Sequence, residues 1–294
     1  MIILQMMGGL GNQMFQYAFY LQLKSLGRQV KIDDESGFTE DKQRFPALAP
    51  FGITYEKASL WEIRKMRDSF PYPWSKVKRK LFGRNKKAYF EESKLFMPQI
   101  FTWDDIYLDG FWQSEKYFSD VEEQVKEAFL KNVPNMLSKD ALTYLSQIEE
   151  SESVSVHIRR GDYLLPENEA LFGNICTESY YENAVRQIQD KHPDCVFYLF
   201  TNDTDWGREW IIHNGEKIFG SDRVVLVETA VKQDYEALIL MSRCKHNIIA
   251  NSSFSWWASY LNENRDKLVM APEVWLNGWD CRDIYRDDMI RVER

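Results

Sequence analysis

Short apolar runs and amphipathic stretches alternate along the first half of the chain. The apolar residues 2–6 predict a buried strand, and residues 29–32 predict a second strand. Between these strands, apolar side chains recur at helical spacing, at Met14, Tyr17, Ala18 and Leu21. Residues 105–108 predict a further strand and residues 117–133 a long helix, whereas residues 38–101 are irregular and rich in proline, aromatic and basic residues.

After Pro134 the alternation starts again with a larger set of elements. Apolar runs predict strands at residues 154–156, 196–200, 224–227, 247–250 and 268–270. Helical patterns lie between them at residues 179–191, 234–244 and 254–261. Strands that alternate with helices imply parallel sheets, so the predicted fold class is α/β. Two such sets predict two Rossmann-like domains, residues 1–150 and 151–294, that face each other across a cleft.

Length and charge narrow the classes of protein that fit this pattern. A chain of 294 residues is long enough for two domains. Its composition, 44% hydrophobic and 28% charged, is typical of a globular protein. The formal net charge of −8 leaves no basic excess to neutralise phosphates, which argues against nucleic acid as the main partner.

The cysteines and the N-terminal residues indicate the cellular compartment in which the protein is expected. The four cysteines are scattered without a C-x-x-C pair or a Cys/His metal spacing, which predicts reduced thiols in a cytosolic protein. The chain starts directly with a strand-like run, and nowhere do 18 apolar residues follow one another. We therefore expect a cytoplasmic protein that neither spans a membrane nor is secreted.

One basic segment departs from the acidic average. Residues 76–87 carry seven lysines and arginines, with Val77, Leu81 and Phe82 between them. A basic amphipathic segment of this kind is a candidate for peripheral contact with the anionic inner face of a membrane. The alternative is a solvated helix face or a loop.

The stretch HIRRGDY, residues 157–163, follows a strand-like run and places fixed positive charge at the strand's carboxyl end. In open α/β sheets, ligands bind at that edge. Arginine makes planar bidentate hydrogen bonds and stays charged, so Arg159 and Arg160 suit a diphosphate. The alternative is a salt-bridged turn in which Asp162 holds Arg160.

The glycine turn at residues 8–13 lies between the first strand and the first helix. It fails the dinucleotide fingerprint G-x-G-x-x-G because Met14 stands at the third glycine, although Asp33 is at a suitable distance for a ribose. Gly9 and Gly11 still let backbone N–H groups approach a ligand at the positive end of a helix, and Asn12 adds an amide. The alternative is a tight turn with a helix cap.

A third strand-to-helix junction carries Asn251, Ser252, Ser253 and Phe254. Asparagine and serine are preferred N-cap residues, so capping alone would explain them. Small hydroxyl side chains beside a helix N-terminus also form an anion site for a phosphate. Trp256 and Trp257, which follow in the sequence, are expected to pack as core.

After the strand at residues 196–200, Asn202 precedes a D-x-D pattern, Asp203-Thr204-Asp205. One class of sugar transferases uses such a pattern to hold a divalent metal on a nucleotide diphosphate. The arginines at residues 159 and 160 would make that metal redundant. We therefore favour Asp203 as a hydrogen-bond acceptor for base or ribose, with metal binding as the alternative.

Together these motifs resemble a known family. GGLGNQMFQYA, HIRRGDY and NSSFSWWASYLN occur in the order found in bacterial and animal α-1,2-fucosyltransferases of glycosyltransferase family 11, and DGFWQSEKYF at residues 109–118 also resembles that family. Related α-1,6- and protein O-fucosyltransferases share the middle motif. The resemblance implies a GT-B fold, GDP-fucose as donor, inversion at the fucose anomeric carbon, and no metal or other cofactor.

The resemblance also assigns expected roles to residues. His157 and Arg159 fall on positions that contact the guanosine and the diphosphate, and Asn12 falls on an asparagine near the reacting centre. Asp234 lies near a carboxylate that reads guanine, but Ala237 stands where the family often has a second acid. The catalytic candidates are Arg159, Asn12 and His157. The candidate donor-binding residues are Gly9, Gly11, Asn12, His157, Arg159, Arg160, Asp162, Asn202, Asp203, Asp234, Asn251, Ser252, Ser253 and Phe254.

The expected acceptor is the 2-hydroxyl of a terminal β-galactoside in an oligosaccharide or lipid-linked glycan. Acceptor choice is expected to reside in residues 38–101, where Trp61 and Trp74 can stack on sugar rings or pack as core. Two other function classes remain open. One is a metal-dependent sugar transferase that uses Asp203 and Asp205, and the other is a non-catalytic nucleotide-sugar-binding protein.

Overall fold

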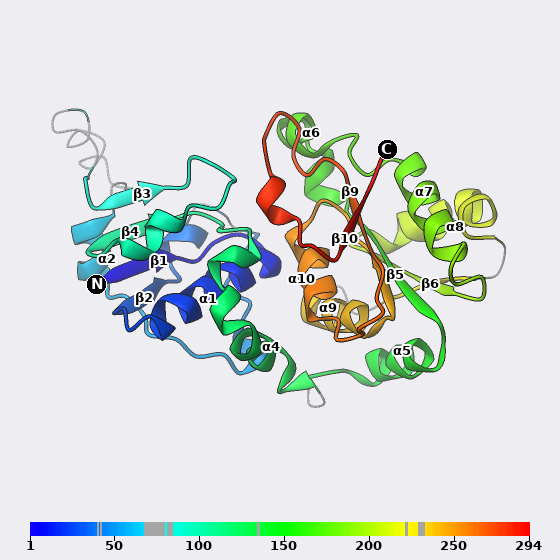
Figure 1. Cartoon of the computed structure of the whole chain (residues 1–294), viewed down its shortest axis with the longest axis horizontal. Helices are drawn as coiled ribbons and strands as arrows, with labels where there is room; N and C mark the ends of the chain where they lie inside the picture. The colour runs from blue at the N-terminus through cyan, green and yellow to red at the C-terminus, as the bar shows by residue number, and fades with distance from the viewer. Residues whose placement is uncertain are drawn as a thin grey trace. The chain divides into compact units, whose positions relative to one another are not determined.

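The computed structural model describes residues 1–39, 41, 43–67, 80, 85–133, 136–220, 223–228 and 233–294. The chain forms two compact units, Met1–Lys131 and Asn132–Arg294. Each unit contains a parallel sheet with helices between its strands, so the prediction of an α/β chain with two Rossmann-like units is confirmed (Figure 1).

The boundary between the units lies earlier than residue 150, where the sequence pattern placed it. Helix α5 (Lys139–Glu150) accounts for the difference because it belongs to the second unit. Its Ala141 and Ile148 are buried in one core with Leu240 and Met241 of α9 (Asp234–Arg243). The connecting stretch therefore precedes this helix rather than following it.

The sheet of the first unit has the order β2-β1-β4-β3, with all neighbouring strands parallel. The strands are β1 (Ile2–Gln5), β2 (Val30–Asp33), β3 (Ala88–Phe90) and β4 (Ile106–Asp109). All four residues of β1 are buried, as expected for a central strand covered on both faces. The chain moves outward from β1 to β2 and later returns to the other side of β1, so the topological switch point lies between β1 and β4.

In the described part of the first unit, the helices are α1 (Leu10–Ser25), α2 (Leu60–Met66) and α4 (Glu122–Leu130). The predicted helix at residues 117–133 is wrong in its first part, where 3₁₀ turns occupy Glu115–Tyr117 and Ser119–Val121. Phe118 lies between these turns with an extended φ of −147°, and its side chain is fully buried. Aromatic packing overrides the helical pattern there.

The sheet of the second unit is parallel throughout, with the order β10-β9-β8-β5-β6-β7. The strands are β5 (Ser153–Ile158), β6 (Val196–Thr201), β7 (Val224–Leu226), β8 (His246–Ile248), β9 (Val269–Pro272) and β10 (Met289–Val292). The chain runs from β5 outward to β7 and then resumes at β8 on the other side of β5. The switch point of this sheet therefore lies between β5 and β8.

Two hydrophobic cores cover the faces of this sheet. Alternate residues of β6 enter different cores: Phe197 and Leu199 lie in one, and Tyr198 and Phe200 lie in the other. The remaining helices of the unit are α6 (Pro166–Phe172), α7 (Glu178–Gln189), α8 (Thr204–Phe219) and α10 (Ser253–Leu261). Among the described residues, no helix is long and apolar enough to cross a membrane.

Candidate functional site

The predicted motifs of the second unit meet at the switch point of its sheet. Arg159 and Arg160 follow the end of β5, and Asn251 and Ser252 follow β8, the strand paired directly with β5. Asn202 and Asp203 follow β6, the neighbour of β5 on its other side. Three loops from the carboxyl ends of adjacent parallel strands thus converge at the edge where open α/β sheets bind ligands.

His157 joins two of these loops from inside the unit. It is 3% exposed, its Nδ1 lies 2.9 Å from the Ser255 hydroxyl of α10, and its ring centroid lies 5.5 Å from that of Phe254. The Ser255 hydroxyl also accepts the Ala250 N–H at 3.2 Å. Burial, with the nearby charge of Arg159, lowers the pKa of His157 to about 3, so the imidazole is neutral at physiological pH.

Tyr163 makes a second connection between the same two loops. Its hydroxyl donates to the Asn251 carbonyl at 2.8 Å, and its ring stacks on Phe172 with centroids 4.4 Å apart. The Arg159 guanidinium carbon lies 5.8 Å from the centre of the Tyr163 ring. Arg159 is therefore next to the residue that fixes its loop to the start of α10.

Arg160 is placed differently from Arg159. Its guanidinium lies over the Trp206 ring at 4.0 Å, and its Nε lies 3.7 Å from the Asp203 carboxylate. Its backbone N–H donates to Asn202 Oδ1 at 2.9 Å. Arg160 thus pairs with Asp203. The alternative in which Asp162 holds Arg160 stays untested, because the side chain of Asp162 lies outside the described part of the structure.

The carboxylates of the D-x-D pattern have separate partners. Asp203 caps α8 by accepting the Trp206 N–H at 3.1 Å and also faces Arg160. Asp205 pairs with Arg208 at 2.6 Å. These pairings do not test metal binding, so the role of Asp203 as a hydrogen-bond acceptor for base or ribose stays a prediction.

The start of α10 combines capping with an accessible first turn. Ser252 is the N-cap, and its hydroxyl accepts the Phe254 N–H at 3.4 Å. Ser253 and Phe254 are partly exposed, whereas Asn251 is buried with its amide nitrogen donating to the Trp275 carbonyl. The expectation that Trp256 and Trp257 pack as core is confirmed, since both are fully buried.

The acid proposed to read guanine lies at the start of α9. Asp234 is exposed in the first turn of this helix. Ala237, three residues later, is partly buried and packs against the core that α5 and α9 share. Glu236, which sequence reasoning missed, is 1% exposed and accepts the Ser138 N–H at 2.6 Å. A guanine contact by Asp234 stays a prediction.

The glycine turn of the first unit is held by glutamine side chains. Gln13 donates to the carbonyls of Gly8 and Phe45, both at 2.9 Å, and accepts the Ala47 N–H at 2.7 Å. Gly9 is the N-cap of α1, and a Cβ there would lie 2.7 Å from Nη1 of Arg44. That atom is the end of a flexible side chain and the φ of Gly9 is −76°, so neither the space nor the backbone conformation at Gly9 requires glycine.

Three further residues of the first unit were candidates for ligand contact. Gly11 is buried in the first turn of α1, and Asn12 accepts a hydrogen bond from Gln113 at 2.7 Å. Asp33 is 1% exposed and accepts the Tyr107 hydroxyl at 2.7 Å. An internal role of this kind argues against Asp33 as a ribose contact.

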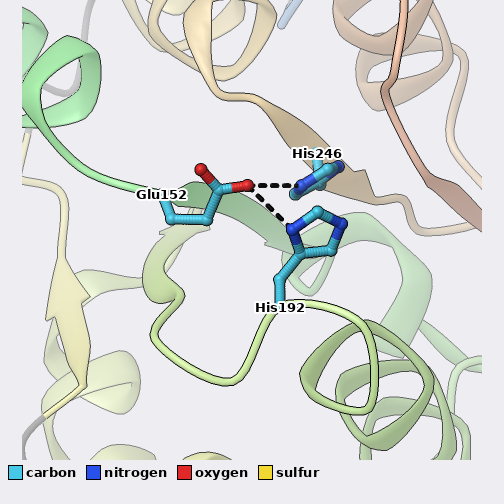
Figure 2. A group of neighbouring side chains, drawn as sticks. All are labelled: Glu152, His192 and His246. Carbon is cyan, nitrogen blue, oxygen red and sulfur yellow. Dashed lines mark hydrogen bonds and ion pairs between the residues drawn. The ribbon is translucent and has the colours of Figure 1, made fainter.

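Sequence reasoning also missed a polar cluster of Glu152, His192 and His246 (Figure 2). Glu152 Oε1 lies 2.9 Å from His192 Nδ1 and 3.1 Å from His246 Nε2, and the Lys245 ammonium lies 2.7 Å from Oε2. The Leu268 N–H donates to His246 Nδ1 at 3.0 Å, so Nε2 of the neutral ring carries the proton and is a donor. A metal ion bound to Nε2 would need a lone pair on that nitrogen, and the proton occupies it. We therefore interpret the cluster as structural: it links segments at the amino-terminal edge of the sheet.

Two other predicted features fall partly outside the described residues. Of the basic segment, Lys80, Lys86 and Lys87 are described, whereas Lys76, Lys78, Arg79 and Arg84 lie outside, as does Trp74. Trp61 is described, and 69% of it is exposed, so it does not pack as core. Contact of the segment with a membrane stays a prediction.

Two Rossmann-like units, one with paired arginines at its switch point, are the architecture expected of a GT-B glycosyltransferase. The model of the family described as "Glycosyl transferase family 11" matches residues 1–290. The chain therefore belongs to glycosyl transferase family 11, which confirms the family resemblance.

Three relatives illustrate the range of this similarity. An α-1,2-colitosyltransferase of Escherichia coli is 30% identical over 100% of this chain and 99% of that protein. The O-antigen biosynthesis glycosyltransferase WbnK of Escherichia coli is 29% identical over 97% of this chain and 98% of that protein. Galactoside alpha-(1,2)-fucosyltransferase 1 of Lagothrix lagotricha is 27% identical over 86% of this chain and 63% of that protein.

Proposed function

We propose that this glycosyltransferase moves L-fucose from GDP-fucose to the 2-hydroxyl of a terminal β-galactoside, with inversion and without a metal. The observation that carries the proposal is the convergence of Arg159 with the N-terminus of α10 at the switch point between β5 and β8. The relatives named as α-1,2-fucosyl- and α-1,2-colitosyltransferases support the linkage and the class of sugar.

In this proposal the diphosphate binds to the second unit. Departure of GDP places growing negative charge on a phosphate oxygen while the sugar becomes cationic. Preorganised donors directed at such an oxygen give the largest single stabilisation in many enzymes. The Arg159 fork and the first-turn N–H groups of α10 supply these donors, with Ser252 and Ser253 beside them. Arg160 contacts Trp206 and Asp203, so its main role is to hold the loop that follows β5.

The neutral state of His157 fits this arrangement. A protonated imidazole would need a counter-charge in a site that is 3% exposed, whereas a neutral ring pairs with Ser255 without one. We assign His157 the task of holding the β5 loop against the start of α10. Asn12 is assigned to the sugar end of the donor, as the family resemblance implies.

The relatives leave two donor sugars to compare. Colitose differs from L-fucose by the absence of the 3-hydroxyl group. A site that binds this hydroxyl through hydrogen bonds rejects the deoxy sugar strongly, because a buried polar group would then be unpaired. Assays with GDP-fucose and GDP-colitose side by side therefore define the donor. We expect the higher kcat/KM with GDP-fucose.

The acceptor is proposed to be a galactose-terminated oligosaccharide or a lipid-linked glycan. A relative named for O-antigen biosynthesis is in keeping with a glycan of this kind. Exposed Trp61, over which the Lys65 ammonium lies at 5.2 Å, offers an aromatic face to a sugar ring.

Nucleotide choice tests the proposal before any acceptor is known. Guanine presents an N1–H and an exocyclic amine, and a carboxylate such as Asp203 or Asp234 can accept from both. We expect GDP to raise the unfolding temperature while UDP, ADP and NAD at equal concentration do little. Binding at about a hundred times Kd stabilises the folded state by about 2.7 kcal/mol. Greater stabilisation by UDP or NAD would contradict the proposed donor.

A further inference from the structure

The two nitrogens of the His157 imidazole have different surroundings. Nδ1 lies 2.9 Å from the Ser255 hydroxyl at the start of α10. The described residues provide no hydrogen-bond partner for Nε2, although His157 is only 3% exposed. Buried polar atoms in native structures have partners as a rule, so one without a protein partner needs an explanation, and a bound ligand is one. Nε2 is therefore the end of the ring that a ligand can meet.

His157 lies close to the anion site proposed for the second unit. It is near the carboxyl end of β5, two residues before Arg159. The positive charge of Arg159 contributes to the lowered pKa of the imidazole, so the two side chains interact electrostatically. A neutral imidazole can offer one N–H group to an anion bound by Arg159, but only the tautomer with its proton on Nε2 can do so from the unpaired end.

The Ser255 hydroxyl has three polar neighbours and a single proton. Its oxygen accepts the Ala250 N–H at 3.2 Å, and this backbone group can only donate. Two atoms can accept the hydroxyl proton: His157 Nδ1 at 2.9 Å and the Ser252 carbonyl oxygen at 3.5 Å, a long distance for a hydrogen bond from a hydroxyl. The shorter contact is the better hydrogen bond. Donation to Nδ1 leaves the ring proton of His157 on Nε2.

The other tautomer of His157 fits an occupied anion site less well. With the ring proton on Nδ1, the Ser255 oxygen would accept two N–H groups, and its own proton would have only the Ser252 carbonyl at 3.5 Å. Nε2 would then present a lone pair, which repels a phosphate oxygen. A bound diphosphate therefore favours the same tautomer as the Ser255 hydroxyl does.

We propose that Ser255 is a positioning residue for His157: its hydroxyl donates to Nδ1 and keeps the ring proton on Nε2, which donates to a phosphate oxygen of the bound nucleotide. The inference rests on the proposed function, because it takes the diphosphate of GDP-fucose as the anion beside Arg159. Capping of α10 leaves Ser255 without a task, since Ser252 is the N-cap of that helix. All of these residues belong to the second unit.

Nitrogen NMR of the protein with isotope-labelled histidine reads the tautomer directly, because a protonated and a bare ring nitrogen differ in chemical shift. The chain has four histidines, and the spectrum of His157→Gln identifies the signals of His157 by their loss. In the GDP complex at neutral pH, we expect a protonated Nε2 and a bare Nδ1. His246, whose Nδ1 accepts the Leu268 N–H at 3.0 Å, is the internal reference for this tautomer. A bare Nε2 on His157 would overturn the proposal.

Two substitutions of His157 separate the two ends of the ring. The amide nitrogen of glutamine can reach the position of Nε2, whereas that of asparagine reaches only the position of Nδ1. We expect the Kd for GDP to be about tenfold higher in His157→Asn than in His157→Gln, since a hydrogen bond to a charged group is one of the stronger kinds. Equal Kd values in the two variants would contradict the donor role of Nε2.

Ser255→Ala removes the donor to Nδ1. We expect the His157 signals to change from one tautomer to a mixture, and the Kd for GDP to rise about threefold to tenfold. The matched control is Ser242→Ala, because Ser242 is also a buried helical serine and its hydroxyl donates to the Ile239 carbonyl at 2.7 Å. This control should leave the tautomer and the Kd unchanged.

The outcomes distinguish the inference from the proposed function. A Ser255→Ala protein that keeps the ring proton on Nε2 and binds GDP as the wild type does overturns the positioning role of Ser255 alone. The wild-type spectrum tests the tautomer even where Ser255→Ala does not fold. A wild-type protein that does not bind GDP overturns the proposed donor, and the role of Nε2 with it.

Discussion

Replacement of Arg159 by lysine is expected to lower turnover by about two orders of magnitude or more. The lysine keeps the positive charge but loses the planar fork that binds two phosphate oxygens at once. Loss of one donor to a developing negative charge costs roughly 2.7–4 kcal/mol in the transition state. The measurement is kcat and KM with GDP-fucose, with the unfolding temperature as a check on folding.

The neighbouring arginine provides the matched control. Arg160→Lys removes the contact with the Trp206 ring and the approach to Asp203, which are contacts within the protein. We expect this variant to lose stability and to retain more turnover than Arg159→Lys. Near-normal kcat in a folded Arg159→Lys protein would remove Arg159 from the mechanism. A larger loss from Arg160→Lys would exchange the roles of the two arginines.

Gly161→Ala is expected to lower turnover by up to about a hundredfold, because small displacements of positioned groups cost that much. Gly161 has a φ of +61°, and a Cβ there would lie 2.5 Å from Asn202 Nδ2. Asn202 must then move by about an ångström, and its Oδ1 holds the backbone N–H of Arg160. The loop that carries Arg159 is displaced as a result.

The control variant Gly220→Ala separates the effect of the clash with Asn202 from the effect of backbone strain. Gly220 has a φ of +75°, and a Cβ there would have nothing within 4 Å. Gly220→Ala therefore places a Cβ at a positive φ, which L side chains rarely adopt, without the clash. Both variants should lose similar stability, but only Gly161→Ala should lose turnover. Equal kinetic effects would show that the clash with Asn202 has no bearing on the reaction.

The sequence predicted the buried strands well and several helices poorly. Strand β6 has large apolar or aromatic side chains on both faces, so its run is continuous and easily recognised. Helix α8 was missed because Gly207 and Gly215 interrupt its pattern. In the structure these glycines allow close packing: a Cβ on Gly207 would lie 3.0 Å from a methyl group of Thr201. Such tertiary contacts are invisible in a local pattern.

Prediction of the candidate site from the sequence has a similar limit. The motifs indicated which loops meet, because each follows a strand and the carboxyl ends of parallel strands share one edge. They did not indicate which of the two arginines forms an ion pair with Asp203. Nor did they indicate that Gln113 and Asn12, separated by 101 positions, form a hydrogen bond. Pairings across such distances depend on the fold, so a single sequence does not contain them in readable form.

The transfer reaction tests the central claim most directly. GDP-fucose and a terminal β-galactoside are incubated with the protein in excess EDTA, and the product is examined by NMR. The account predicts an α-linked fucose on O2 of the galactose, formed at the same rate with EDTA as with added magnesium. A product fucosylated at another position, activity that requires manganese or magnesium, or turnover with a UDP-sugar in place of GDP-fucose would contradict it.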